Sequence, residues 1–291
     1  MKIGIIGHGF VGKATDYGFN TKSVQKFVVD PNYHSTVEDM VNAGDPKFSF
    51  IAVPTPMNED GSINSSIIES VFNDLVKHKS NTIAIVKSTV TPDVISKLEK
   101  IYPRMVYNPE FLTERNANED FVNAEFLIIG GNSPALVDAV EHLYVNHSMC
   151  KPCPVHKVDL QAASMIKYTL NCFMATKVLF FNQIKDLFDK SGTSTPWGQF
   201  TGIIGADSRM GKTHMSVHGP DGRKGFGGAC FTKDTAALIT YANKVGTPFT
   251  SLEEVVSANQ EIRNQYSELD EREKEQNVNY NFGAKTLSVV K

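Results

Sequence analysis

The first 144 residues alternate short runs rich in β-branched and aromatic residues with amphipathic stretches, a pattern typical of βαβ units on a parallel sheet. The expected strands are residues 2–6, 23–29, 48–53, 82–86, 105–107 and 126–129. The clearest helices between them are residues 65–77, 92–100 and 134–144. Because parallel strands need crossover connections, this half of the chain predicts a doubly wound α/β domain.

The second half of the chain has a different, helical pattern. Residues 159–190 read as one long helix, followed by expected helices at 195–204, 231–244 and 249–275. A chain of 291 residues also fits two domains of ordinary size better than one large domain. We therefore expect domains at residues 1–157 and 158–291. A helix this long serves as a domain connector or a dimer seam, or is a core helix wrapped by its neighbours.

Composition and charge exclude several classes of protein. Apolar residues make up 41% and charged residues 21%, which is ordinary globular usage and excludes a disordered chain. A net charge of -3 leaves no general basic field for nucleic acid or anionic lipid. No apolar run approaches the roughly 20 residues of a membrane span, and the start of the chain does not resemble a signal peptide. With only four cysteines, we expect a cytoplasmic protein.

A glycine loop follows the first expected strand directly. Residues 7–12 read Gly-His-Gly-Phe-Val-Gly and open a helix, the context in which a diphosphate sits at the helix N-terminus. Asp30 ends the second expected strand, where its carboxylate can accept hydrogen bonds from ribose hydroxyls and repels a ribose phosphate. The pattern predicts a Rossmann-like NAD site rather than an NADP site. Its candidate residues are Gly7, Gly9, Phe10, Val11, Gly12 and Asp30.

Two more loops follow strands of the same expected sheet. Residues 53–56 read Val-Pro-Thr-Pro, and residues 87–90 read Lys-Ser-Thr-Val. Ligands of an open parallel sheet gather at the carboxyl ends of its strands. The hydroxyls of Thr55, Ser88 and Thr89 are therefore candidates for positions beside the cofactor, although either loop could be an ordinary turn.

The most informative stretch is residues 225–234, Gly-Phe-Gly-Gly-Ala-Cys-Phe-Thr-Lys-Asp. It places Cys230 at a helix start, where the helix dipole and Lys233 are expected to lower the pKa of the thiol. Asp234 lies one turn further along the same face. A single cysteine is often a small buried hydrophobe, but this surrounding favours a catalytic thiolate.

Several motifs, taken together and in order, resemble the nucleotide-sugar 6-dehydrogenases of the UDP-glucose/GDP-mannose dehydrogenase family, and the members acting on UDP-glucose most closely. The matching segments are residues 87–89 (Lys-Ser-Thr), 108–114 (Asn-Pro-Glu-Phe-Leu-Thr-Glu), 207–211 (Asp-Ser-Arg-Met-Gly), 225–234 and the pair Lys167 and Asn171. The resemblance extends over nearly the whole chain. It implies a Rossmann-like NAD-binding domain followed by an all-helical domain like that of 6-phosphogluconate dehydrogenase.

The resemblance also implies a reaction, the NAD-dependent four-electron oxidation of the C6 alcohol of a nucleotide sugar. Cys230 would capture the aldehyde as a thiohemiacetal, and the second oxidation would leave a thioester that water hydrolyses. The implied catalytic residues are Cys230, Lys167, Asn171, Asp234, Glu110 and Thr89. Asp234 and Lys167 would hold a water that takes the hydroxyl proton. Glu110 would act as the base for hydrolysis.

Further binding residues are carried over in the same way. Glu114 and Lys233 join the expected cofactor site. The implied substrate residues are Glu110, Phe111, Leu112, Lys167, Asn171, Arg209, Phe226 and Gly227, with Arg209 reaching across a homodimer interface. The residues themselves also allow interpretations without a function. A lysine on an apolar helix, such as Lys167, usually extends to water, and Glu110 and Glu114 could be surface carboxylates.

The chain departs from the family pattern in places. Full-length members continue into a third domain that covers the nucleotide, and we expect a short form without it. The added cations Arg223 and Lys224 could compensate for the missing clamp or belong to a solvated turn. Thr232 stands where the family usually has Pro, and Arg115 where it usually has Gly.

Other interpretations remain open. His147, Cys150, Cys153 and His156 recur every three residues, but one short stretch rarely surrounds a zinc ion, so we expect no metal site. The rival functions are a single-step hydroxyacid or 6-phosphogluconate-type dehydrogenase and a non-catalytic nucleotide-sugar binding module.

Overall fold

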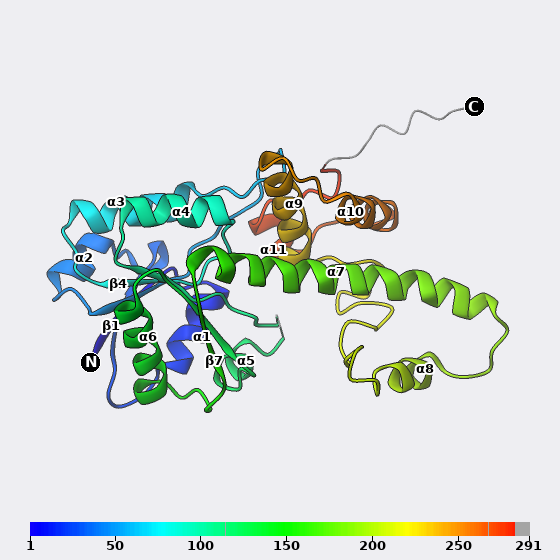
Figure 1. Ribbon diagram of the computed structural model, residues 1–291, viewed down its shortest axis with the longest axis horizontal. Coiled ribbons are helices and arrows are strands. Elements are labelled where there is room, and N and C mark those ends of the chain that lie inside the picture. Colours follow the sequence, from blue (N-terminus) through cyan, green and yellow to red (C-terminus); the bar gives the residue numbers. More distant parts are fainter. Residues whose placement is uncertain (114, 267, 283–291) are drawn as a thin grey trace. The chain divides into compact units, whose positions relative to one another are not determined.

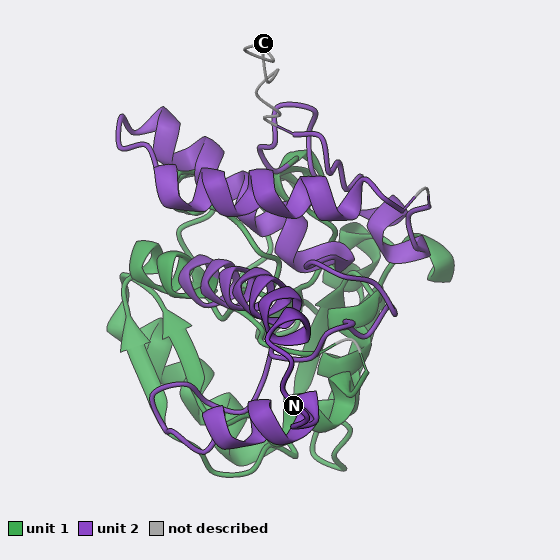
Figure 2. Ribbon diagram, turned by 90° about the vertical axis from the view of Figure 1, so that its right-hand side faces the viewer, with its two compact units in different colours: residues 1–55, 64–167 green, residues 56–63, 168–291 purple. Residues whose placement is uncertain are grey.

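The structure, a computed structural model, describes residues 1–113, 115–266 and 268–282. The chain divides into two compact units (Figure 2). Unit 1 comprises Met1–Thr55 and Asn64–Lys167, and unit 2 comprises Pro56–Ile63 and the chain from Tyr168 onward. The division at residue 167 falls inside a long helix. The domain boundary expected after residue 157 stays a prediction.

Unit 1 is built on a seven-stranded sheet in the order β2-β1-β3-β4-β5-β6-β7 (Figure 1). The strands are β1 (Lys2–Ile6), β2 (Gln25–Val29), β3 (Phe48–Ile51), β4 (Ile83–Val86), β5 (Met105–Tyr107), β6 (Leu127–Gly130) and β7 (Val155–Val158). The doubly wound α/β prediction is confirmed. Two details differ from it: β5 and β6 pair antiparallel, through Tyr107 and Gly130, and β7 was not predicted. β7 reads Val-His-Lys-Val and lies half-exposed at the sheet edge, so it carries no apolar run.

Helices cover both faces of this sheet (Figure 1). On one face, α1 (Phe10–Gly18), α5 (Ala117–Val122) and α6 (Pro134–His147) share a buried core with the strands. On the other face lie α2 (Val37–Asn42), α3 (Ser66–Lys77) and α4 (Pro92–Ile101). A short 3-10 turn, Pro31–Tyr33, follows β2. This layering places the carboxyl ends of β1 to β5 together at one edge, where the candidate loops lie.

Unit 2 is helical, as expected. Its helices are most of α7 (Leu160–Lys190), then α8 (Trp197–Ile204), α9 (Gly228–Lys244), α10 (Thr250–Arg263) and α11 (Glu271–Glu275). The prediction of one helix over residues 249–275 is wrong. α10 ends at Arg263, and α11 begins after Asp270, whose carboxylate accepts from the Glu273 amide in a capping box. The Asp-x-x-Glu signal for a helix start was present in the sequence.

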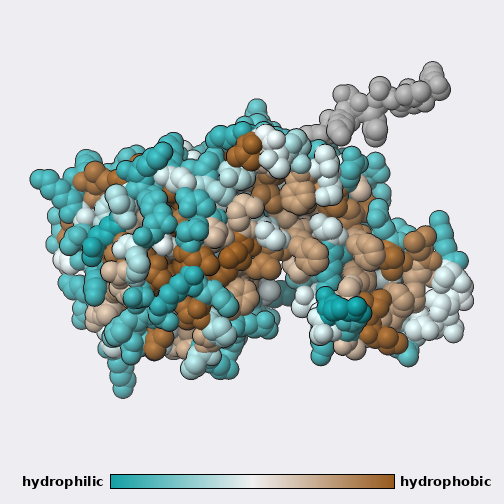
Figure 3. All heavy atoms as spheres, viewed as in Figure 1, coloured by the Kyte–Doolittle hydropathy of each residue, from teal (hydrophilic) through white to brown (hydrophobic). Residues whose placement is uncertain are grey.

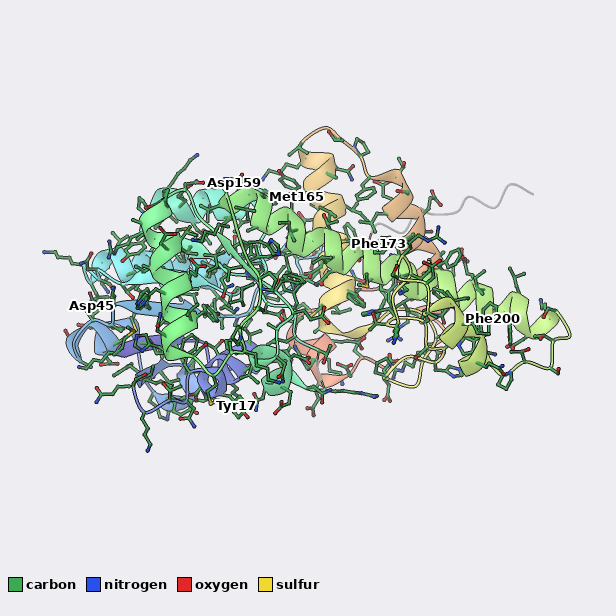
Figure 4. The ribbon with its side chains drawn as sticks, turned by 60° about the horizontal axis from the view of Figure 1, so that its bottom comes forward. Tyr17, Asp45, Asp159, Met165, Phe173 and Phe200 are labelled. Carbon is green, nitrogen blue, oxygen red and sulfur yellow. The ribbon has the colours of Figure 1, made fainter. Side chains whose placement is uncertain are left out.

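Along α7, apolar side chains divide between a buried and an exposed face. Tyr168, Ala175 and Leu179 are buried, whereas Phe173 and Phe180 are 61% and 53% exposed. Figure 4 labels Phe173 on this helix, and Figure 3 shows apolar side chains at the surface of this part of unit 2. None of the helices in the described ranges is both long enough and apolar enough to span a bilayer.

Candidate active site

The glycine loop occupies the turn from β1 into α1. Gly7 has φ +88°, and a Cβ at Gly12 would lie 2.0 Å from the Gly7 carbonyl oxygen, so glycine is required at both positions. At Gly9 an added Cβ would meet no described atom within 4 Å. The loop is therefore closely packed between Gly7 and Gly12 and open at Gly9. The open side leaves room for a diphosphate at the N-terminus of α1. Phe10 and Val11 form the first turn of that helix.

Asp30 ends β2 beside this loop. Its carboxylate accepts hydrogen bonds from the His8 amide at 2.7 Å and from the Asn32 amide at 2.9 Å. Burial acts to raise the pKa of Asp30, but these two bonds outweigh it and the pKa is lowered. Each carboxylate oxygen keeps a free lone pair for a ribose hydroxyl. The structure thus brings the glycine loop and the strand-terminal carboxylate together.

The loops after β3 and β4 bond to each other. Thr55 Oγ1 donates to the Thr89 carbonyl at 2.9 Å, and Ser88 Oγ donates to the Val53 carbonyl at 2.7 Å. Thr55 and Ser88 are buried. The two hydroxyls therefore fix the shape of both loops at the carboxyl edge of the sheet, so part of their hydrogen-bonding capacity is structural.

Lys167 and Glu110 form a buried pair within unit 1. Lys167 Nζ donates to the Glu110 main-chain carbonyl and lies 3.3 Å from Glu110 Oε1. Glu110 Oε2 accepts from the Leu112 amide at 2.6 Å, and the Lys167 ammonium lies 5.1 Å from the Phe111 ring centroid. Four of the predicted residues are thus brought together. Glu114 lies outside the described residues.

A second cluster lies within unit 2, on α7 and α9. Asn171 Nδ2 donates to Asp234 Oδ2 at 2.6 Å, and Lys233 Nζ lies 2.6 Å from Asp234 Oδ1. Asp234 is 1% exposed and Lys233 5% exposed. A carboxylate this deeply buried is stable because a cation and an amide hold it. The lysine expected to act on the Cys230 thiol therefore neutralises Asp234.

Cys230 lies in the first turn of α9, which begins at Gly228, three residues earlier than the sequence predicted. Its side chain is partly exposed and is not in a disulfide. Asp234 is four residues further along the same helix and so lies on the same face. Phe226 is buried against Ala175 and Leu179 of α7, which anchors the loop that precedes the cysteine.

The other candidate cations of unit 2 are engaged locally. Arg209 is highly exposed and is held by a fork of hydrogen bonds to Asp207. Lys224 pairs with Asp186 at 2.6 Å, and Arg223 donates to the Glu268 carbonyl and lies over the Tyr266 ring. These contacts favour the interpretation of residues 219–224 as a structured turn over that of a free phosphate clamp.

Sequence reasoning missed Lys87 as a structural centre. It is 3% exposed, donates to Asn108 Oδ1 at 3.0 Å and lies 5.5 Å from the Phe121 ring centroid. The Tyr144 hydroxyl donates to the same oxygen, and Asn108 Nδ2 donates to the Ile128 carbonyl. Burial lowers the pKa of Lys87 to about 8. The available signal was a lysine placed directly after an apolar strand, with an asparagine ending the next one.

The histidines and cysteines spaced every three residues do not form a ligand set. His147 Nδ1 lies 3.2 Å from Ser23 Oγ, and Cys150 Sγ contacts the Phe121 carbonyl. Over the described residues, no group of three or more His, Cys, Asp or Glu side chains is arranged to hold a metal ion.

A mostly parallel sheet with a glycine loop after β1 and a carboxylate after β2 is the architecture of a dinucleotide-binding domain. Comparison with known proteins agrees. Residues 37–148 match the NAD binding domain of the UDP-glucose/GDP-mannose dehydrogenase family, and residues 161–261 match the central domain of that family. The chain belongs to the UDP-glucose/GDP-mannose dehydrogenase family.

Individual proteins with family names of this kind are also similar to the chain. The UDP-glucose 6-dehydrogenase TuaD of Bacillus subtilis is 31% identical over 252 residues, 82% of this chain and 52% of its own length. YwqF, another UDP-glucose 6-dehydrogenase of that organism, is 33% identical over 220 residues, covering 72% of this chain and 48% of the relative. The chain therefore spans about half the length of these relatives. A UDP-glucose dehydrogenase from Pyrobaculum islandicum shares the fold, with a TM-score of 0.76 and 24% identity over 89% of this chain and 68% of that one.

Proposed function

We propose that the chain oxidises the C6 alcohol of UDP-glucose to the carboxylate, with NAD as oxidant and Cys230 as nucleophile. The observation that carries the proposal is the buried Asp234, one helical turn beyond Cys230, held by Lys233 and by Asn171 of α7. A cysteine in a first helical turn with a fixed carboxylate on the same face suits covalent capture of an aldehyde.

The residues of unit 1 fit the cofactor. Gly7, Gly9 and Gly12 would hold the diphosphate at the N-terminus of α1, with Asp30 on the adenosine ribose. Thr55, Ser88 and Thr89 would border it at the ends of β3 and β4. Bound NAD supplies the hydride acceptor for each of the two oxidations.

The proposed roles in unit 2 follow from charge and position. Asp234, fixed by Asn171 and Lys233, would hold the water that takes the proton of the C6 hydroxyl. Loss of that proton and of a first hydride, which bound NAD would accept, would leave the C6 aldehyde. The Cys230 thiolate would then add to it, forming a C–S bond and, with one proton, a thiohemiacetal. Loss of the thiohemiacetal hydroxyl proton and of a second hydride would leave a thioester on the same sulfur. Phe226 and Gly227 would line the sugar-nucleotide pocket.

Unit 1 would supply the remaining groups. The Lys167 ammonium is desolvated and suits stabilisation of a developing alkoxide. The Glu110 carboxylate would take a proton from the water that attacks the thioester, which breaks the C–S bond and returns the Cys230 thiol. Thr89 and Asn171 would help to position that water, and Phe111 and Leu112 would contact the substrate.

The proposal includes a homodimer formed through α7. Phe173, Phe180 and Leu187 recur every seven residues on one face of the helix and are 61%, 53% and 66% exposed. A stripe of large apolar side chains is costly in water and suits a copy of the same helix. Arg209 would then reach the substrate of the partner. Four cysteines free of disulfides support placement in the reducing cytoplasm.

The test is the stoichiometry of NADH formation with UDP-glucose, with GDP-mannose and UDP-N-acetylmannosamine as competing substrates. Two NADH per UDP-glucose consumed, and no uronate from Cys230→Ser, are expected. One NADH per substrate would favour a single-step dehydrogenase. No NADH from any of the three, with NAD still bound, would refute the enzyme and favour a binding module.

A further inference from the structure

The nucleophile loop, residues 225–228, is held by side chains from other parts of unit 2. The Gly225 amide donates to Asn182 Oδ1 at 3.0 Å, and the Phe226 amide donates to Asn259 Oδ1 at 2.8 Å. The Gly228 amide, at the start of α9, donates to Glu273 Oε1 at 2.9 Å. The Gly228 amide, of a kind that a helix start usually leaves to water, is here satisfied by the buried Glu273 side chain.

Glu273 is the most enclosed of these partners. It is 0% exposed, and besides the Gly228 amide it accepts from the Tyr280 hydroxyl at 2.5 Å and from the Asp270 amide at 2.9 Å. Burial acts to raise its pKa, but the hydrogen bonds of Tyr280, Asp270 and Gly228 and the charge of Arg263 outweigh it, so the pKa is lowered. Glu273 therefore carries its negative charge against the amide of Gly228, two residues before Cys230.

Arg263 pairs with Glu273 and with a second carboxylate, Asp221. Its guanidinium lies 3.3 Å from Glu273 Oε1 and 2.6 Å from Asp221 Oδ2, and it is 2% exposed. A Cβ at Gly227 would lie 2.2 Å from Arg263 Nη2, so the guanidinium packs where only glycine leaves room. One side chain thus links the preceding turn, the nucleophile loop and α11.

We propose that Asn259, Arg263 and Glu273 form a positioning cluster that sets both the geometry and the charge environment of Cys230. Arg263 and Glu273 lie beyond residue 261, where the match to the family's central domain ends. The proposal rests on the proposed role of Cys230 as nucleophile. Asn259 fixes the loop by bonding both the amide and the carbonyl of Phe226. The Arg263 guanidinium, shared between Asp221 and Glu273, offsets part of the negative charge beside the first turn of α9.

The charged and titratable groups around the cluster come from several elements. They are Asp221 and Lys224 in the preceding turn, Lys233 and Asp234 on α9, Tyr266 and Tyr280, and Asp270 before α11. Lys233 and Asp234 neutralise each other, and Lys224 is paired with Asp186. Removing Glu273 therefore makes the surroundings of the first turn of α9 more positive by one charge, and removing Arg263 makes them more negative by one charge.

The two substitutions change the charge near Cys230 in opposite directions, so opposite shifts of the thiol reactivity are expected. Glu273→Gln keeps an oxygen for the Gly228 amide but removes the negative charge, and Arg263→Gln removes the positive one. The midpoint of Cys230 alkylation by iodoacetamide, followed by mass spectrometry across pH, is expected to move about 0.5 to 1 unit lower in the first variant and higher in the second. A displaced loop should also reduce kcat at least about tenfold in both, with the NAD affinity unchanged.

Controls separate positioning from folding. Asn264→Ala removes a contact between α10 and Asn281 at the neighbouring position without touching the loop, and should behave like the wild type in both measurements. General destabilisation would move both midpoints in one direction or in neither, and that result would overturn the proposal. Near-ultraviolet circular dichroism verifies that each variant is folded.

Should the charge variants not fold, Tyr280→Phe removes one hydrogen bond from the same Glu273 oxygen and keeps both charges. A kcat about threefold lower is expected, and a wild-type kcat would overturn the proposal. If the wild-type protein shows no turnover, the proposed function fails, but the two alkylation midpoints still decide the positioning cluster.

Discussion

The Lys167 ammonium and the Glu110 carboxylate face each other 3.3 Å apart, with side chains only 3% and 8% exposed. Residue 110 follows β5 and residue 167 lies in α7, so the contact joins segments 57 residues apart in the chain. In a dry environment each charge depends on the other, because removing one partner leaves an uncompensated buried charge.

Lys167→Met is therefore expected to lower the free energy of unfolding by about 3 to 5 kcal/mol and to abolish turnover. The double variant with Glu110→Gln should recover much of the stability, because no unpaired charge remains, but no turnover. Urea unfolding and NADH formation measure the two effects. A single variant as stable as the wild type would contradict the ion pair.

The glycine loop predicts two different responses to the same substitution. Gly12→Ala puts a Cβ against the Gly7 carbonyl and should destabilise unit 1 by about 1 to 3 kcal/mol. Gly9→Ala meets no described atom and should change stability by less than about 0.5 kcal/mol, yet weaken NAD binding. Thermal unfolding and NAD titration distinguish them, and unchanged NAD affinity in Gly9→Ala would place the diphosphate elsewhere.

Lys87 predicts a pH dependence of stability. Its pKa is lowered to about 8 by burial, from 10.5 in water, so the unfolded chain binds more protons between these values. The cost of burying the charged form is present below about pH 8 and is relieved as pH rises toward 10.5. Relative to Lys87→Met, the wild type should gain about 2 to 3 kcal/mol between about pH 7 and about pH 10. Urea unfolding measures the difference in stability between the wild type and Lys87→Met at each pH. The same difference at both pH values would count against a charged, buried Lys87.

The exposed stripe on α7 predicts the oligomeric state. Phe180→Glu places a charge in the proposed seam and should convert the dimer to a monomer in sedimentation velocity. Val145→Glu, at a residue 70% exposed on α6 of unit 1, is the matched control and should leave the dimer intact. A wild-type protein that sediments as a monomer would remove the homodimer from the proposal.

Much of the fold was predictable because its signals are local. Alternating apolar runs place the first six strands, and the glycine loop with Asp30 predicts a candidate dinucleotide site. β7 was not predicted because an edge strand needs no apolar run. The break between α10 and α11 was not predicted because the charged residues there give no apolar periodicity to mark a helix end. The motifs around Cys230 and Lys167 also identify the candidate site residues without any coordinates.

The sequence by itself determined the architecture of unit 1, the helical character of unit 2 and the family. Only the tertiary structure decided which partner each buried charge meets: Lys167 with Glu110, Lys233 with Asp234, Lys87 with the Asn108 amide, and Arg263 with both Asp221 and Glu273. The physical reason is that secondary structure follows from periodicity within a few residues. The pairing of a buried charge depends on which distant segment folding brings within hydrogen-bonding distance.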